Sequence, residues 1–97
     1  VDCFLGLPFN ITSYALLTHI IADICGLKTG ELIMVLGDTH IYSNHIEQCQ
    51  AQMRREPRNF PKLSIKNHHE KPEEYEFADF ELIGYEPYAG IKAPMAT

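Results

Sequence analysis

The sequence has few basic residues, no stretch with the pattern of a leader and no long uninterrupted hydrophobic run. Eight Lys and Arg stand against 13 Asp and Glu, which gives a formal net charge of −5. General binding to nucleic acid or to an anionic membrane surface needs a basic excess, so the composition argues against both functions. The longest apolar region is interrupted by Thr18, His19 and Asp23, and no basic segment leads into an apolar stretch with a small-residue cleavage site. These absences favour a soluble protein.

Cysteine is also scarce. Cys3, Cys25 and Cys49 are odd in number, widely spaced and without a C-x-x-C pair, which argues against a disulfide framework and against a zinc site. This usage is typical of a reducing, cytoplasmic compartment. His40 and His45 are five residues apart, the wrong offset for one helical face, and the sequence offers no third ligand beside them. We therefore expect no metal.

The residues that are present indicate a packed globular protein. The hydrophobic fraction is 45%, with five Phe and five Tyr, and a length of 97 residues suits one small domain with a marginal core. No repeat, linker or low-complexity tract divides the chain, so we treat residues 1–97 as a single α+β domain. Because the chain starts with Val1 and "VDCFLGLPF" has the pattern of the middle of a strand–turn element, we expect a piece of a longer protein.

The first part of the sequence predicts a helix over residues 10–26. Asn10 or Thr12 can cap its first turn, and Gly26 suits the left-handed position after its end. Apolar residues mark one face at helical spacing and extend onto the other faces, so the helix should be buried nearly all round. These residues are Tyr14, Leu17, Ile21 and Ile24 on the first face and Ala15, Leu16 and Ile20 elsewhere.

Three strands and a second helix are expected downstream. The run "ELIMVLGDTHIY" predicts a buried strand over residues 31–36. Ser43 can cap a helix over residues 44–55, with Ile46 and Met53 directed inward. The alternating segments "KLSIK" and "FELIGYE" predict two further strands, separated by a charged loop in which His68 and His69 should be solvated. The last dozen residues are interpreted as an irregular tail.

Several polar side chains could carry chemistry, and each has a structural alternative. The Asn10 amide could pair with a flat heterocycle by donating one hydrogen bond and accepting another, or it could cap the helix. His40 and Tyr42 project to the same side of an extended segment, which suits either a sugar hydroxyl or a buried pair. Asp2 could be a binding carboxylate or a solvated strand end. The tail with Lys92 could close over a ligand or could fray.

Several segments resemble one enzyme family. "DCFLGLPFNITSYALL" resembles the thymidylate synthase pattern D-x-x-L-G-x-P-F-N-x-x-S-Y-A-x-L, and "GDTHIYSNHIEQ" resembles the family's G-D-x-H-x-Y-x-N-H. "RREPRNFPKL", "DFELIGYEP" and "IKAPMA" also match in order and spacing, so the resemblance covers essentially the whole chain. It implies a homodimer with an α/β fold around a large sheet. It also implies conversion of dUMP to dTMP, with 5,10-methylenetetrahydrofolate giving the one-carbon unit and the hydride.

The resemblance implies roles for individual residues. Asn10 falls on the asparagine that reads the uracil edge, where cytosine would leave buried polar groups unpaired. His40 and Tyr42 fall on the pair that binds the deoxyribose hydroxyl of dUMP. Asp2 falls on the aspartate that hydrogen-bonds the folate pterin, and we count it among both the dUMP and the folate contacts. Leu5, Gly6 and Phe9 match the folate-side wall. Ala96 matches the tail alanine that contacts the cofactor on closure, and Ser13 and Asp38 match two orienting groups.

The resemblance also implies what the chain does not hold. It corresponds to the C-terminal part of the fold, a buried helix against a mixed sheet, because the family's cysteine nucleophile and phosphate-binding arginines correspond to positions before Val1. The 97 residues alone should then be inactive. Tyr88 and Ala89 stand where His-Pro is usual, and Thr97 where an apolar residue is usual, which puts the closed packing of the tail in question.

Two alternative functions stay open. A dUMP hydroxymethylase of the same family would use the same folate and add water instead of hydride. The cytidylate type carries an aspartate at the position of Asn10 and is therefore disfavoured. The second alternative is a non-catalytic split or decayed fragment, which would act only as an interaction module by docking on a partner.

Overall fold

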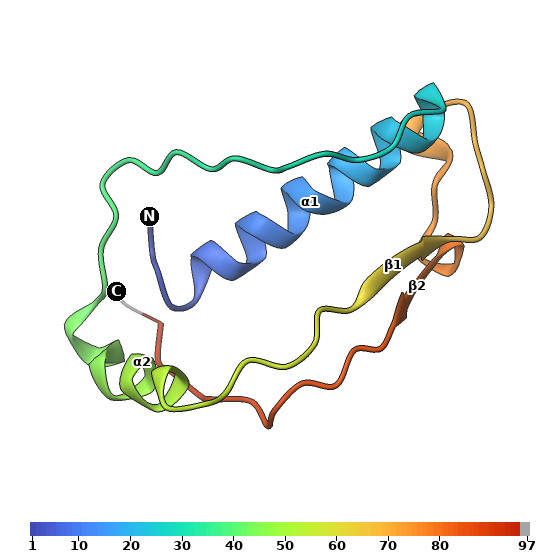
Figure 1. Ribbon diagram of the computed structural model, residues 1–97. Helices are drawn as coiled ribbons and strands as arrows, with labels where there is room; N and C mark the ends of the chain where they lie inside the picture. The colour runs from blue at the N-terminus through green and yellow to red at the C-terminus, as the bar shows by residue number, and fades with distance from the viewer. Residues whose placement is uncertain (96–97) are drawn as a thin grey trace. The chain divides into compact units, whose positions relative to one another are not determined.

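The computed structural model describes residues 1–95 (Figure 1). It contains two α-helices and a two-stranded antiparallel sheet, in agreement with the α+β class. The elements in chain order are α1 (Gly6–Cys25), a 3₁₀ turn (Ser43–His45), α2 (Ile46–Met53), β1 (Lys62–Ile65), two further 3₁₀ turns (Pro72–Glu74 and Phe77–Asp79) and β2 (Phe80–Ile83).

The contacts of these residues divide the chain into two units. The first unit holds Val1–Tyr14, Ile33–Pro57 and the described residues from 88 onward. The second unit holds Ala15–Leu32 and Arg58–Pro87. Each unit is built from segments that are distant in the sequence, so its polar contacts join parts of the chain that no local pattern relates.

Helix α1 begins at Gly6, four residues before the predicted start. Asp2 explains the early start, because its Oδ2 accepts the Gly6 N–H at 3.2 Å and its carbonyl accepts the Leu7 N–H at 2.7 Å. Pro8 lies in the first turn, where a missing N–H costs no helical hydrogen bond. The strand–turn interpretation of "VDCFLGLPF" is therefore wrong for Gly6 and Pro8, which lie in the first turn of the helix.

The predicted cap of α1 is wrong for the same reason. Asn10 lies in the second turn and cannot cap a helix that has already begun. The Thr12 hydroxyl donates to the Pro8 carbonyl at 2.8 Å, a bond to the preceding turn that leaves the helix N-terminus untouched.

The end of α1 is as predicted. Gly26 has φ of 67°, a left-handed conformation that costs least for glycine. The Leu27 N–H donates to the Ala22 carbonyl at 2.8 Å and the Gly26 N–H to the Asp23 carbonyl at 3.3 Å. These two bonds form a Schellman motif, which satisfies carbonyls that the helix end would leave free.

The strand predicted over residues 31–36 is wrong for the described chain. These residues have no regular secondary structure, and among residues 1–95 no segment pairs with them. A strand exists only where a neighbouring chain segment takes up its backbone hydrogen bonds, whatever the apolar pattern. Val35 is 93% exposed, so the predicted burial is not found either.

The second helix forms about where it is predicted, but with a different start. Ser43 is the first residue of a 3₁₀ turn rather than a cap, and the residue before it gives no side-chain capping bond. The α-helical part is only Ile46–Met53. Ile46 is 50% exposed and Met53 84% exposed, so their predicted inward orientation is wrong because the described residues place nothing over them.

The two strands predicted from "KLSIK" and "FELIGYE" are confirmed. β1 and β2 pair antiparallel, with Lys62 opposite Ile83 and Ile65 opposite Phe80. Period-two alternation and the proline-marked loop between the strands suffice to specify this hairpin, because both partners are present in the sequence.

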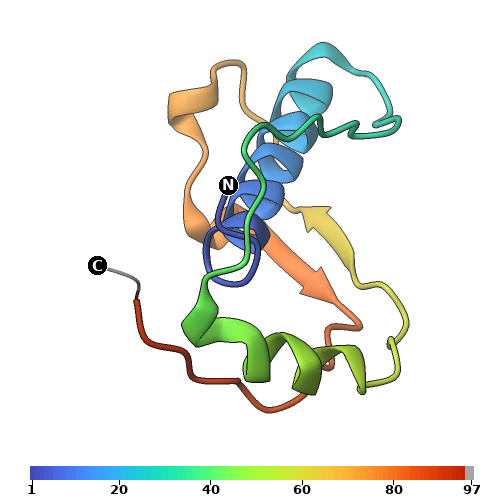
Figure 2. The same ribbon diagram turned by 90° about the vertical axis from the view of Figure 1, so that its left-hand side faces the viewer.

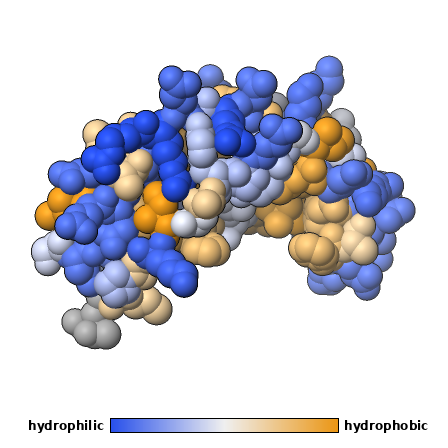
Figure 3. Space-filling model, turned by 90° about the horizontal axis from the view of Figure 1, so that it is seen from below, coloured by the Kyte–Doolittle hydropathy of each residue, from blue (hydrophilic) through white to orange (hydrophobic). Residues whose placement is uncertain are grey.

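Apolar side chains lie on the surface throughout the described residues. None of them is buried, and only His45 and Asp79 are buried among residues 1–95. Orange apolar atoms are accordingly open to view in Figure 3. On α1 the exposed side chains include Phe9, Ile11, Tyr14, Leu17 and Ile21, so the predicted burial of this helix all round is wrong for the described residues. These residues supply no core of the kind that stabilises a domain of this length.

Neither described helix has the length and apolarity that crossing a bilayer requires.

Candidate functional site

The first unit gathers its polar residues around one parallel bridge between Asp2 and His40. The Cys3 N–H donates to the His40 carbonyl and the His40 N–H donates to the Val1 carbonyl, each at 3.0 Å. Two segments that the sequence separates are thereby held side by side. The carboxylate and the imidazole that were predicted as site residues are on these two segments.

Asp2 is held by the start of α1. Its Oδ2 accepts the Gly6 N–H. A Cβ at position 6 would lie only 3.3 Å from the Asp2 Cβ, so the close packing of these two residues favours glycine at position 6. The other carboxylate oxygen, Oδ1, is buried and has no hydrogen-bond partner among the described residues. It lies 3.9 Å from Nδ1 of His45.

Aromatic rings form a row beside Asp2. The His40 and Tyr42 ring centres are 4.8 Å apart and nearly perpendicular, and Tyr42 meets His45 in the same way at 5.7 Å. Phe4 meets His45 at 5.7 Å from another direction. The predicted pair of His40 and Tyr42 is therefore in direct contact.

The orientation of His40 is set by Asp38. Nδ1 of His40 lies 2.8 Å from the Asp38 carbonyl and 3.4 Å from the Val1 amino nitrogen, and the shorter contact, to a group that can only accept, favours the tautomer with the proton on Nδ1. In the neutral ring Nε2 is then an acceptor suited to a hydroxyl group. Asp38 adopts φ of 46°, a left-handed conformation that aspartate tolerates better than most residues. Asp38 contacts His40 through its backbone carbonyl and not through its side chain.

His45 is the residue that sequence reasoning missed. Its side chain is 0% exposed, and its Nε2 lies 2.5 Å from the carbonyl of Pro94 near the C-terminus. The sequence raised this histidine only as a poor metal ligand. The signal that could have found it is its place at the end of the motif that also contains His40 and Tyr42.

The C-terminal segment runs beside α2, as Figures 1 and 2 show. Nη1 of Arg55 donates to the Ala89 carbonyl at 2.9 Å, and its guanidinium lies 5.3 Å from the Tyr88 ring centre. The Tyr88 hydroxyl donates to the Glu56 carbonyl at 2.9 Å. The side-chain amide of Gln48 donates to the Lys92 carbonyl at 3.4 Å. Tyr88 and Ala89, which stand where the family pattern has His-Pro, therefore both contact residues at the end of α2 or just after it.

A cavity of about 260 Å³ lies beside this segment. Leu5 and Phe9, both predicted for the folate-side wall, line it together with Arg55. The other lining residues are Phe4, Pro8, Gln52, Ala89, Gly90 and Ile91. The depression is open to solvent, and its lining is both polar and apolar.

The remaining predicted site residues do not contact the cluster around Asp2 within the described residues. Asn10 and Ser13 lie on exposed positions of α1, and the structure describes no hydrogen bond or ring contact between Asn10 and the His40–Tyr42 pair. Ala96 lies outside the described residues. Cys3, Cys25 and Cys49 are free thiols. Within residues 1–95 no group of three or more His, Cys, Asp or Glu side chains could hold a metal ion.

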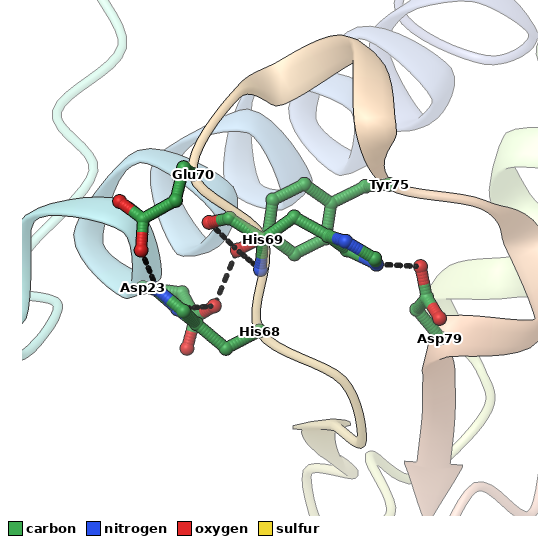
Figure 4. A network of polar contacts seen from close by, with 6 residues as sticks. All are labelled: Asp23, His68, His69, Glu70, Tyr75 and Asp79. Atoms are coloured by element: carbon green, nitrogen blue, oxygen red, sulfur yellow. Dashed lines mark hydrogen bonds and ion pairs between the residues drawn. The ribbon is translucent and has the colours of Figure 1, made fainter.

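The second unit has its own polar network, shown in Figure 4. His68 lies between two carboxylates, with Nδ1 3.0 Å from Asp23 Oδ2 and Nε2 3.3 Å from Glu70 Oε1. The Tyr75 hydroxyl donates to the same oxygen of Asp23. Hydrogen bonds to Asp23 and Glu70 raise the pKa of His68. The Tyr75 and His68 bonds lower the pKa of Asp23, and burial raises the pKa of Tyr75.

Asp79 anchors the other end of this network. It is 6% exposed and accepts the Glu76 N–H at 2.8 Å, the Asn67 side-chain amide at 2.9 Å and His69 Nε2 at 3.0 Å. These bonds, led by that from Glu76, lower the pKa of Asp79. The predicted solvation is confirmed for His68, whose side chain is 50% exposed, whereas His69 is half-buried. Both also contact carboxylates, Asp23 and Glu70 for His68 and Asp79 for His69, which the sequence did not indicate.

In this α+β protein a carboxylate, two imidazoles and a phenol gather in the first unit, and these are the donor and acceptor groups that a small-molecule site uses. Residues 1–97 match the family model described as thymidylate synthase. The chain belongs to the thymidylate synthase family. Intact members of this family are methyltransferases of dTMP synthesis that bind dUMP and folate, use methylenetetrahydrofolate as co-substrate and typically form dimers.

Proposed function

We propose that these residues are the C-terminal part of a cytoplasmic, homodimeric thymidylate synthase that converts dUMP to dTMP. The observation that carries the proposal is the Asp2–His40 bridge, which sets a carboxylate beside the His40–Tyr42 pair in a chain that matches the family throughout. The nucleophilic cysteine and the phosphate-binding arginines come from a preceding segment. The 97 residues therefore form one domain with that segment and are inactive without it.

The pyrimidine is read by Asn10. Its side-chain carbonyl accepts the ring N–H of uracil while its amide donates to a ring carbonyl, and cytosine presents the opposite pattern. Because Asn10 lies inside α1 rather than at its end, its backbone is fixed on both sides by helical hydrogen bonds. Ser13, one turn further along the same helix, supports this orientation.

The deoxyribose hydroxyl is bound by His40 and Tyr42. With Nδ1 of His40 engaged by the Asp38 carbonyl, Nε2 accepts from the hydroxyl, and the Tyr42 phenol completes the contact. The perpendicular ring contact between the two residues holds both tips in place.

The folate is bound on the other side of Asp2. The Asp2 carboxylate, whose Oδ2 accepts the Gly6 N–H, is the group that hydrogen-bonds the pterin. Leu5 and Phe9 line the cavity that receives apolar parts of the folate, which supplies the one-carbon unit and hydride when bound. Closure of the tail through Ala96 then excludes water from the site.

The test is complementation and product analysis with the complete open reading frame that contains these codons. It should restore growth of a bacterial strain that lacks thymidylate synthase, and the purified enzyme should give dTMP by mass from dUMP and methylenetetrahydrofolate. Hydroxymethyl-dUMP as product would replace the synthase with the hydroxymethylase. A reading frame with no cysteine nucleophile upstream, and no activity, would leave only the interaction module.

A further inference from the structure

The loop between β1 and β2 contains a segment, residues 68–75, whose two ends meet on one atom (Figure 4). Nδ1 of His68 lies 3.0 Å from Oδ2 of Asp23, and the Tyr75 hydroxyl donates to the same oxygen. Asp23 belongs to the last turn of α1, and all three residues belong to the second unit. A single carboxylate oxygen therefore attaches both ends of the segment to this helix.

The two ring nitrogens of His68 both face carboxylates. Nδ1 faces Asp23 of α1, and Nε2 lies 3.3 Å from Oε1 of Glu70 within the segment. Because an ionised carboxylate can only accept, each contact is a hydrogen bond only when its ring nitrogen carries a proton. A neutral ring has one such proton and leaves its other nitrogen facing an acceptor, whereas a charged ring donates to both carboxylates. The arrangement therefore favours the charged ring.

The charges around the ring act in the same direction. Asp23 and Glu70 are the charged groups that act on His68, and hydrogen bonds to them raise its pKa from the usual 6.5, whereas His69 is directed to Asp79. The His68 side chain is 50% exposed, so solvent screens the pair and its contribution is modest. The stabilisation is complete below pH 6.5 and is lost as the pH rises through the raised value. This window begins just below neutral pH.

Other contacts of the loop keep their protons through this window. Burial, followed by the bond to Asp23, raises the pKa of Tyr75, so its hydroxyl retains the proton that it donates. At the base of the loop, Asp79 accepts the Glu76 N–H and the Asn67 amide, and these bonds lower its pKa. Loss of the imidazole proton therefore frees only the first end of the segment.

We propose that Asp23 and His68 form a proton-dependent clasp, which closes residues 68–75 onto the end of α1 and opens as the pH rises. In the closed form both ends of the segment share the Asp23 oxygen. In the open form the Tyr75 end stays attached, while the first end, with the exposed Glu70, is released to solvent. The clasp contains none of the proposed dUMP or folate contacts, so it does not rest on the proposed function.

The experiment measures cleavage of the complete enzyme by a protease that cuts after glutamate, at about pH 6 and about pH 9. Cleavage after Glu70, Glu73 and Glu74 reports the segment, and cleavage after Glu47 on α2 reports general unfolding. At each pH the rate for His68→Gln is divided by that for the unmodified enzyme, which cancels the pH dependence of the protease. Within the segment we expect a ratio of up to about 5 at the lower pH, the size of an exposed ion pair, and near one at the higher pH.

His19→Gln is the matched control. His19 lies one turn before Asp23 on the same helix, and among residues 1–95 the structure describes no hydrogen bond or ion pair for it. Its ratio should stay near one at both pH values. A ratio for His68→Gln that does not change with pH overturns the proposal. Equal acceleration after Glu47 also overturns it, because His68 would then have a merely structural role.

A second measurement needs no variant for its main result. The ring shifts of His68, followed against pH in the unmodified enzyme, should give a midpoint above the usual 6.5, and a midpoint at or below 6.5 overturns the proposal. Asp23→Asn keeps an acceptor for Tyr75 but removes the charge, so the midpoint should fall back toward 6.5; an unchanged midpoint would exclude Asp23 as the partner. Neither measurement uses catalysis, so an enzyme without synthase activity would refute the proposed function and leave the clasp standing.

Discussion

Arg55 offers a direct test of how the C-terminal segment is seated, because it makes two contacts with that segment. Its Nη1 donates to the Ala89 carbonyl at 2.9 Å, and its guanidinium lies 5.3 Å from the centre of the Tyr88 ring. We expect Arg55→Ala to remove both contacts and to loosen the segment.

The magnitude follows from the two contacts. A hydrogen bond from a charged donor contributes about 1.5–3 kcal/mol and an exposed cation–π contact about 0.5–1 kcal/mol. Arg55 is half-buried and Ala89 is exposed, so solvent screening favours the lower values, about 2 kcal/mol together. The ratio of molecules whose C-terminal segment is bound to Arg55 to those in which it is detached should fall by up to about 30-fold. Arg55→Lys keeps the charge but loses the planar contact and should fall between the two.

The assay is steady-state kinetics of the complete enzyme, combined with limited proteolysis of the C-terminal segment. Cleavage should be faster in Arg55→Ala, and the KM for the folate should rise while that for dUMP changes little. Arg54→Ala, an exposed neighbour with the same change of charge, is the control. If Arg55→Ala and Arg54→Ala show equal cleavage rates and equal KM values, the contacts with Ala89 and Tyr88 do not seat the segment.

Three other changes test separate parts of the structure. Gly26→Ala should lower the stability of the complete enzyme by about 1 kcal/mol, because Gly26 has φ of 67°, a conformation that is strained for alanine, and the added methyl group gains no contact within 4 Å. Gly30→Ala is the matched control, and equal melting temperatures of the two variants would contradict the prediction. Asn10→Asp should lower kcat/KM for dUMP by about 100-fold and reduce discrimination against dCMP, whereas unchanged discrimination would exclude Asn10 from the base contact. Since Asp23 raises the pKa of His68, the stabilisation from that contact is complete below the usual pKa of 6.5 and is lost as the pH rises through the raised value. The difference in melting temperature between the unmodified enzyme and His68→Gln should therefore shrink with rising pH, and a constant difference would argue against the contact.

The features that the sequence predicts correctly are those whose partners lie nearby in the chain. Gly26 ends α1 through bonds to Ala22 and Asp23 within the same turn, and β1 and β2 are neighbours along the chain. The strand predicted over residues 31–36 needs a distant partner, which no local pattern can supply. An apolar run records that a segment should be buried, but not which segment covers it.

In the candidate site, too, contacts between residues close in the sequence could be predicted and contacts between distant residues could not. His40 and Tyr42 could be paired from their spacing alone, and they are in contact. The contacts of His45 could not be inferred from spacing, because its partners Pro94 and Asp2 lie at opposite ends of the chain. The network around His68 is also non-local, since Asp23 comes from α1. Buried or paired histidines of this kind require the fold before their role can be stated.

Asp2 shows why a choice between a structural and a functional role can be a false one. The sequence allowed it to be a binding carboxylate or a strand end, and the structure gives its two oxygens different tasks. Oδ2 holds the start of α1 through Gly6, while Oδ1 faces His45. Asparagine accepts a backbone N–H about as well as aspartate at a helix start. The helix therefore needs only an oxygen at this position, and the negative charge is left for the pterin contact that we propose for Asp2.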